Sequence, residues 1–316
     1  MSPPPPPFGR SRRRNDPFFD PALDDDELAT VRGQLAQGRW PGVRALLAAT
    51  GDDRERRGHR LVVLGELGSA AAWARDWLIA EPDSPDAAAL LACAAVHRAL
   101  DGREPEDRAR DACRTAARLA PADPTPWLAL LLLARSAGTE EETSRSFEEV
   151  RARHPHHHHA HHLMAARLAE CQRGSGQDPL HEVYDFASWA VESAPADSPL
   201  AVLPVVAHAE RYRVLAAMGH EPDDPAASGH WTGRRARQVM KAAFDWWLEW
   251  GCEDHPRRHV DLNYLAHAKH CEGRPAEAAA LFQRIGPHAT KDPWSYPGRD
   301  PYQAFSAARS AALGYS

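Results

Sequence analysis

Lysine, cysteine, methionine and long apolar runs are all scarce in this chain of 316 residues, which has five cysteines and four methionines. The longest apolar run, Trp127 to Ala134, is far shorter than the roughly 20 residues that a membrane-spanning helix needs. We therefore expect no membrane association. The cysteines form no Cys-x-x-Cys pair and no dense disulfide pattern, which predicts reduced thiols in the cytoplasm.

Motifs of catalysis are absent as well. The chain contains no Gly-x-Ser-x-Gly, no phosphate-binding Gly-x-x-x-x-Gly-Lys-Ser/Thr and no dinucleotide fingerprint behind a strand. The His-Glu-x-x-His pattern of metalloproteases is missing too, because His181-Glu182 is followed by Val183, Tyr184 and Asp185. We therefore expect a protein that is not an enzyme.

An excess of basic charge is also missing. The formal net charge is −6 and the isoelectric point is about 6.3. Affinity for a phosphate backbone comes from clustered cations, so we expect no nucleic-acid partner. Among the 38 basic residues only Lys241, Lys269 and Lys291 are lysines. With so much alanine, proline and glycine, this bias is typical of a high-GC genome.

Proline, in contrast, is abundant and regularly placed between helix-forming segments. Of the 27 prolines, Pro82, Pro121, Pro155 and Pro195 follow one another at intervals of 39, 34 and 40 residues. Glycine-bearing breaks fall midway between them, at residues 101–102, 137–138 and 174–176. Each unit is therefore predicted to be a helix, a turn, a second helix and a proline turn.

This repeat predicts an all-α fold, an α-solenoid of antiparallel helical hairpins. We expect seven hairpins from near Asp25, with two of them between Pro195 and Pro287, and a polar loop at 219–229 within the first of these two. A lone helix from Pro301 to Leu313 is expected to cap the stack, since the last apolar face of a repeat array has no neighbour.

The N-terminal residues differ in kind from the repeats. Residues 1–23 hold five consecutive prolines and an arginine cluster, and they cannot bury enough apolar surface to fold. We therefore expect a disordered tail over 1–23 and one helical repeat domain over 24–316. A ligand for a proline-binding groove is the functional alternative for this tail.

One unit, Pro124 to His157, resembles the 34-residue tetratricopeptide repeat. The residues at the fourth, seventh, fifteenth, twenty-fourth and thirty-second places match that family, and they are Trp127, Leu130, Gly138, Phe147 and Pro155. A second match lies at 272–282, whereas Leu131 and Thr143 replace residues that are usually small. The resemblance covers roughly residues 54–287 and implies a tetratricopeptide-like superhelix.

The same resemblance implies a partner-binding groove, because the first helix of each hairpin lines the concave side in that family. The positions that correspond in this chain are Asp86, His97, Thr125, Leu128, Arg135, His159, His162, Glu170 and Glu210. This mixture of charges suits a polar peptide, so we expect a non-catalytic scaffold that binds a peptide or protein partner. Two alternatives stay open: an accessory or regulatory protein of a biosynthetic or signalling pathway, and a metal-dependent enzyme that uses the histidines.

Seven of the 18 histidines lie within residues 154–162. His158 with His162, and His157 with His161, are one helical turn apart, which permits a two-ligand metal clamp. No acidic residue lies inside the run to complete a site. We therefore expect no cofactor, only adventitious zinc or nickel binding, and a solvated, partly packed start to a helix.

A second group of histidines and cysteines imitates the ligand spacing of a zinc finger. Cys252 and His255 are followed by His267 and Cys271. His267 and Cys271, however, fit a helix whose apolar positions already define a repeat, and a buried cysteine behaves as a small apolar side chain. We expect this pair to pack in the core.

Overall fold

A computed structural model describes residues 17–171, 181–250 and 254–314 of the chain. Across these ranges the regular structure is helical, without a β-strand. The α-helices are α1 (Asp26–Ala36), α2 (Pro41–Thr50), α3 (Arg54–Gly65), α4 (Ala70–Ala80), α5 (Pro85–Leu100), α6 (Glu106–Leu119), α7 (Thr125–Ala137), α8 (Glu140–Arg153), α9 (His158–Glu170), α10 (Glu182–Ser193), α11 (Leu203–Ala217), α12 (Arg234–Trp250), α13 (Arg258–Cys271), α14 (Pro275–Ile285) and α15 (Pro301–Leu313). Short 3-10 turns are η1 (Pro199–Val202), η2 (Pro225–Ala227) and η3 (Gly229–Trp231).

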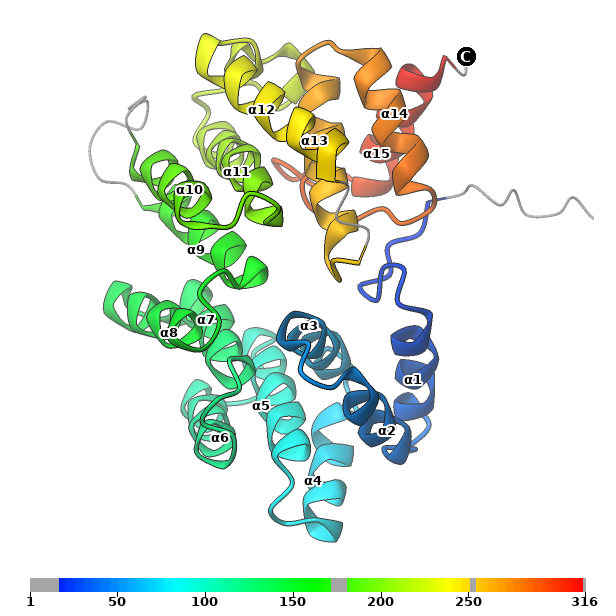
Figure 1. Cartoon of the computed structure of the whole chain (residues 1–316), viewed down its shortest axis with the longest axis vertical. Helices are drawn as coiled ribbons and strands as arrows, with labels where there is room; N and C mark the ends of the chain where they lie inside the picture. Colours follow the sequence, from blue (N-terminus) through cyan, green and yellow to red (C-terminus); the bar gives the residue numbers. More distant parts are fainter. Residues whose placement is uncertain (1–16, 172–180, 251–253, 315–316) are drawn as a thin grey trace, which may run out of the picture.

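Helices α1 to α14 follow one another as seven hairpins, and α15 packs on α14 at the end of the stack (Figure 1). This arrangement confirms the predicted α-solenoid, and the cap has the predicted bounds, Pro301 and Leu313. The polar loop between α11 and α12 holds η2 and η3. No helix in the described ranges combines the length and the apolar character that a bilayer span requires.

Local sequence explains where the helices begin. The side chain of Ser84 accepts a hydrogen bond from Ala87 N at the start of α5, and Pro85 takes the first helical position. Thr139 caps α8 in the same way, by accepting from Glu142 N. The proline turns that set the repeat length are therefore also the helix starts.

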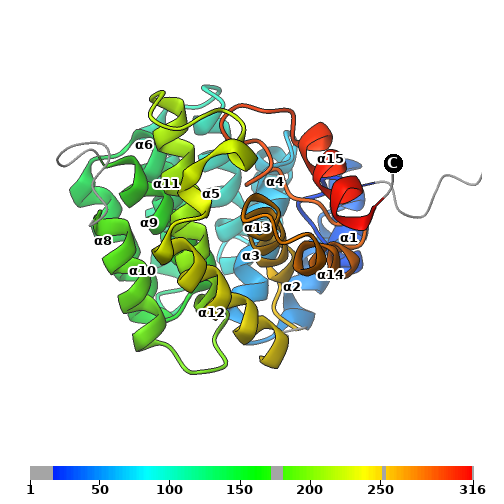
Figure 2. The ribbon, with the colours of Figure 1, turned by 90° about the horizontal axis from the view of Figure 1, so that it is seen from above.

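The first helices of successive hairpins face inward and the second helices lie outside. Figure 2 shows α3 and α5 toward the middle of the molecule, with α8, α10 and α12 at its rim. Burial agrees, because α6 buries a single stripe, Ala109, Cys113 and Ala116, whereas α5 is buried along most of its length.

The two ends of the superhelix meet. Phe18 N donates a hydrogen bond to the carbonyl of Pro287 at 3.0 Å. Arg258 Nη2 lies 2.7 Å from Asp24 Oδ2, and the N-terminal segment runs beside the C-terminal hairpin in Figure 1. Residues 17–23, which we had assigned to the tail, thus pack against the repeat domain, with Leu23 buried. Residues 1–16 lie outside the described residues.

Helices α3 and α5 approach most closely at Gly65. A Cβ there would lie 2.8 Å from Cys93 Cβ and 2.9 Å from Cys93 C, so only glycine fits without a shift. Gly65→Ala should lower the free energy of unfolding by about 1–3 kcal/mol through overpacking. Urea denaturation measures this. Gly68→Ala is the control, since open space surrounds Gly68, and equal stability of the two variants would contradict the close packing.

Candidate functional site

A cavity of about 480 Å³ lies where the inner helices converge. It is lined by residues of α3, α5, α7, α9, α11 and α13, and is bordered by the N-terminal segment and the loop after α14. Its polar side chains on the inner helices and on the turn before α13 are His59, Glu66, His97, Arg135, His159, His162, Glu210, Arg257 and Tyr264. Residues from six repeats therefore share one site.

Five of the nine groove residues that the resemblance implied line this cavity. They are His97, Arg135, His159, His162 and Glu210. The repeat register thus located much of the inner face correctly, although it did not indicate that this face encloses a cavity.

The other four residues lie elsewhere. Thr125 and Leu128 are fully buried, and both lie against Gly58 of α3 where α3 packs on α7. Asp86 forms an ion pair with Arg57, whose side chain is largely buried. In an open superhelix these positions would face solvent, but here α3 covers the inner face of α7.

Glu170, the last of the four, takes part in an ion-pair network at the cavity edge. Arg135 Nη2 donates to Glu170 Oε1 at 3.0 Å, and Arg213 Nη2 donates to the same oxygen at 2.6 Å. The charge of Arg135 is therefore already neutralised within the protein.

Glu210 is the centre of a buried hydrogen-bond network. Its Oε1 accepts from the hydroxyls of Tyr264, at 2.9 Å, and Tyr296, and its Oε2 accepts from Arg213 Nε at 2.8 Å. Burial and the charge of Glu210 raise the pKa values of both tyrosines well above their usual range. The network joins α11 to α13 and to the loop before α15.

Glu210→Gln should lower the free energy of unfolding by about 1–3 kcal/mol, because the amide places a donor against other donors and removes the buried negative charge. Thermal or urea denaturation measures the effect. Glu192→Gln, at an exposed position of α10, is the matched control and should change stability little. No difference between the two variants would show that Glu210 does not hold these helices together.

Arg257 is a cation whose side chain lacks a hydrogen-bond partner among the described residues. It lines the cavity half-buried, and its side chain forms no hydrogen bond or ion pair with any residue that the structure describes. Burial lowers the pKa of Arg257, while the charges of Asp261 and Glu55 oppose that change. A guanidinium in this position is available to an anionic ligand.

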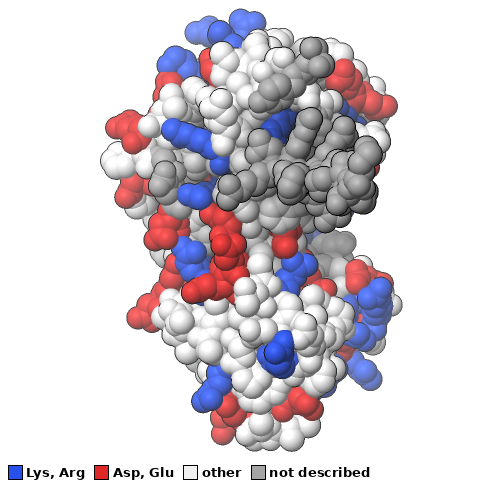
Figure 3. Space-filling view, turned by 90° about the vertical axis from the view of Figure 1, so that its right-hand side faces the viewer, with Lys and Arg blue, Asp and Glu red and all other residues white. Residues whose placement is uncertain are grey.

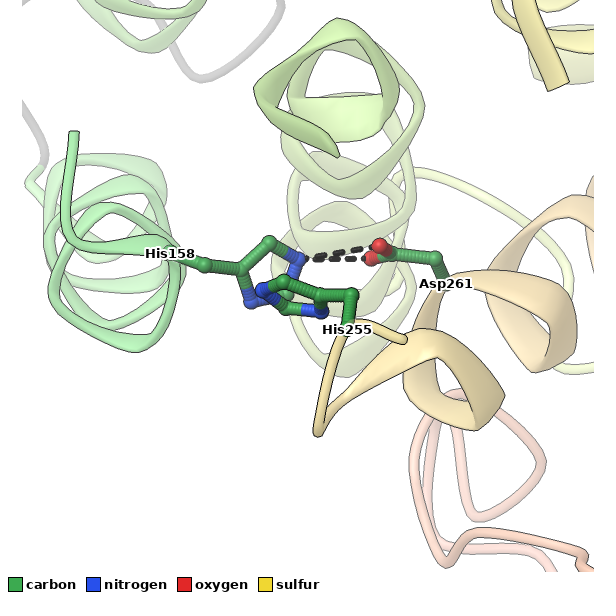
Figure 4. A group of neighbouring side chains, drawn as sticks. All are labelled: His158, His255 and Asp261. Atoms are coloured by element: carbon green, nitrogen blue, oxygen red, sulfur yellow. Dashed lines mark hydrogen bonds and ion pairs between the residues drawn. The ribbon is translucent and has the colours of Figure 1, made fainter. Parts of the chain in front are cut away.

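A cluster of histidines borders the same cavity. His158 Nε2 lies 3.0 Å from both carboxylate oxygens of Asp261, and the His255 ring is 4.5 Å from the His158 ring, as Figure 4 shows. His162 Nε2 is 3.5 Å from Asp261 Oδ1. Burial lowers the pKa values of the three imidazoles well below the usual range and raises that of Asp261.

The histidine run is therefore more fully packed than the solvated, partly packed helix start that we expected from sequence. Of the two spaced pairs, His158 with His162 faces Asp261, whereas His157 with His161 does not join it. His157 caps α9, and His161 Nδ1 donates to the carbonyl of His157 at 2.9 Å. Sequence reasoning missed Asp261 because it lies 103 residues beyond His158.

The described residues of the group with zinc-finger-like spacing do not come together at one site. His255 lies beside His158, while His267 is buried between the rings of Trp231 and Trp294, at 5.2 and 5.1 Å. Cys271 is buried too, with its Sγ 3.8 Å from His267 Nδ1. Cys252 lies outside the described residues.

Comparisons with known proteins find similarity among solved structures but not among family models or curated sequences. No protein-family model and no curated protein sequence matches the chain. Among solved structures, the chain is similar to a monomeric IFIT1 mutant with Gppp-AAAA, with a TM-score of 0.42 and 20% identity over 72% of this chain. The match covers 48% of that chain, so this chain spans about half its length.

This comparison corrects one expectation. The similar structure is with Gppp-AAAA, which stands against our exclusion of nucleic acid as a partner, and we withdraw that exclusion. The exclusion relied on the net charge of the whole chain. Net charge does not decide what a single cavity binds, because ions screen charges beyond a Debye length of about 8–10 Å and the groups inside the cavity dominate there.

Proposed function

We propose that the protein is a non-catalytic cytoplasmic binding protein that takes an acidic peptide segment of a partner protein into its central cavity. Two features support this proposal. The inner helices of six repeats converge on one cavity, and its volume of about 480 Å³ is within the range of binding pockets. Binding a segment in such a cavity requires only complementary side chains.

The observation that carries the proposal is the guanidinium of Arg257 at the cavity wall, which has no hydrogen bond or ion pair to a residue that the structure describes. A charged group that is removed from water without a partner is destabilising. A carboxylate in the cavity compensates for this, because a guanidinium binds a carboxylate through two parallel, charge-assisted hydrogen bonds. The ligand should therefore carry an acidic group at this point.

The charges around the cavity are mixed. The basic residues at its wall are Arg135, Arg257 and Lys291, and the acidic ones are Asp20, Glu66, Glu210 and Asp292. Such a wall suits a polar peptide that brings one carboxylate to Arg257 and neutral or basic side chains to the acidic residues. On the face seen in Figure 3, acidic and basic side chains are likewise interspersed.

A peptide array and a random oligonucleotide pool, probed with the purified chain, test the proposal. Acid-bearing peptides should be retained over copies with Asn and Gln in place of Asp and Glu. Arg257→Gln should weaken their binding roughly tenfold or more, since a hydrogen bond to a charged group contributes about 1.5–3 kcal/mol. Fluorescence anisotropy on the selected peptides measures the dissociation constants.

Arg108→Gln, at an exposed position of α6, is the matched control and should leave these constants unchanged. Equal binding by wild type and Arg257→Gln would contradict the role of Arg257. If the oligonucleotide pool alone yields ligands, and Arg257→Gln abolishes their binding, the cavity binds nucleic acid and the peptide proposal is wrong.

A further inference from the structure

We propose that His158, His255, Asp261 and His162 form a divalent-metal site, and that zinc is the metal that this donor set suits best. The site connects α9 with the turn before α13 and with α13 itself. It goes beyond the peptide-binding function and does not depend on it. It also replaces our expectation that metal binding is only adventitious.

The distances between the donor atoms carry the proposal. One donor atom each from His158, His255 and Asp261 lie within 4.8 Å of one another. In a tetrahedral zinc site, bonds of about 2.0–2.2 Å place neighbouring ligand atoms roughly 3.3–3.5 Å apart. The His158–Asp261 and His162–Asp261 distances, 3.0 and 3.5 Å, are close to that spacing. Figure 4 shows the side chains of His158, His255 and Asp261 close together, and His162, 3.5 Å from Asp261, would become the fourth ligand after a side-chain rotation.

A buried hydrogen bond between His158 and Asp261 explains only part of the cluster. It leaves His162 Nε2 and His255 Nε2 buried without a hydrogen-bond partner among the described residues. Buried polar atoms are almost always partnered, and those that are not call for an unseen water or ion. A metal ion would replace the proton between His158 and Asp261 and would accept the lone pairs of the other two imidazoles.

Two neighbouring residues affect how the ligand side chains would hold a metal. Glu55 accepts a hydrogen bond from His158 N, which fixes the first turn of α9 and with it the direction of the His158 side chain. His255 Nδ1 accepts from Arg257 N at 3.2 Å, so coordination through Nε2 moves the ring proton to Nδ1 and gives up this contact. The positive charge of Arg257 opposes the metal, and Glu55 and Glu66 offset part of it.

The donor types select the metal. Imidazole nitrogens suit zinc, copper, iron and nickel, and three histidines with one carboxylate form a four-coordinate set typical of zinc. Calcium and magnesium prefer oxygen ligands and need more of them than this cluster offers. We therefore expect zinc and cobalt(II) to bind at one site, and calcium and magnesium not to compete.

Isothermal titration calorimetry on the full, tag-free chain, freed of metal by a chelator, tests the site. One zinc ion should bind per chain with a dissociation constant below about 1 µM. His255→Asn and Asp261→Asn should each weaken binding roughly tenfold or more. His156→Gln is the matched control, because His156 belongs to the same histidine run but not to the cluster, and it should bind zinc like wild type.

Cobalt(II) spectra and melting curves provide independent readouts. Cobalt(II) should give the visible absorption of a tetrahedral site in wild type and in His156→Gln, but not in His255→Asn. Zinc should also raise the melting temperature of the wild type, because its ligands bridge helices that are distant in sequence. Absence of stoichiometric zinc binding by the wild type overturns the proposal, whatever the variants do. Binding that survives His255→Asn and Asp261→Asn but is lost in His156→Gln shows adventitious binding only.

Discussion

Closure of the superhelix is the constraint on which the rest of the structure depends. The N-terminal segment joins the C-terminal hairpin through Phe18 and Asp24, and Arg56 reaches Asp254 across the same junction. Exposed ion pairs contribute about 1 kcal/mol or less, so the buried side chain of Leu23 and its neighbours carry most of this junction. Because the ends meet, the inner helices form a half-open cavity where an open solenoid would present a long groove.

Enclosure also determines the chemistry of the inner face. In an open groove His158 and Asp261 would be hydrated and would titrate near their usual pKa values. Here burial keeps the imidazoles neutral and disfavours the charge of the carboxylate, as the directions of their pKa shifts show. Neutral imidazole is the form that donates to metals, so the same packing that removes the histidines from water also prepares them as ligands.

The sequence predicts the fold well because hairpin boundaries are local signals. Proline at 82, 121, 155 and 195 marks turns that any single repeat can specify, and the cap from Pro301 to Leu313 begins at Asp300, which accepts a hydrogen bond from Gln303 N. The approach of α3 to α7 is not local, since the two helices belong to different hairpins and meet only in the assembled stack. This explains why Leu128 was expected in the groove and is buried instead.

The site was less predictable for the same reason. His158 and His162 form a recognisable pair one turn apart, but their carboxylate is 103 residues away and no spacing rule connects the two. Only the closed superhelix places Asp261 beside them. A register copied from an open repeat array can find inner-face residues such as Arg135, but not the contacts between repeats that are distant in sequence.

The cavity and the histidine cluster share one turn of the chain, because His255 and Arg257 are two residues apart. A metal that holds His255 therefore restricts the positions that the guanidinium of Arg257 can take in the cavity. By thermodynamic linkage, any factor by which the metal changes the affinity for an acidic ligand is also the factor by which that ligand changes the affinity for the metal. The sign of this coupling depends on whether the metal-bound turn keeps the guanidinium facing the cavity.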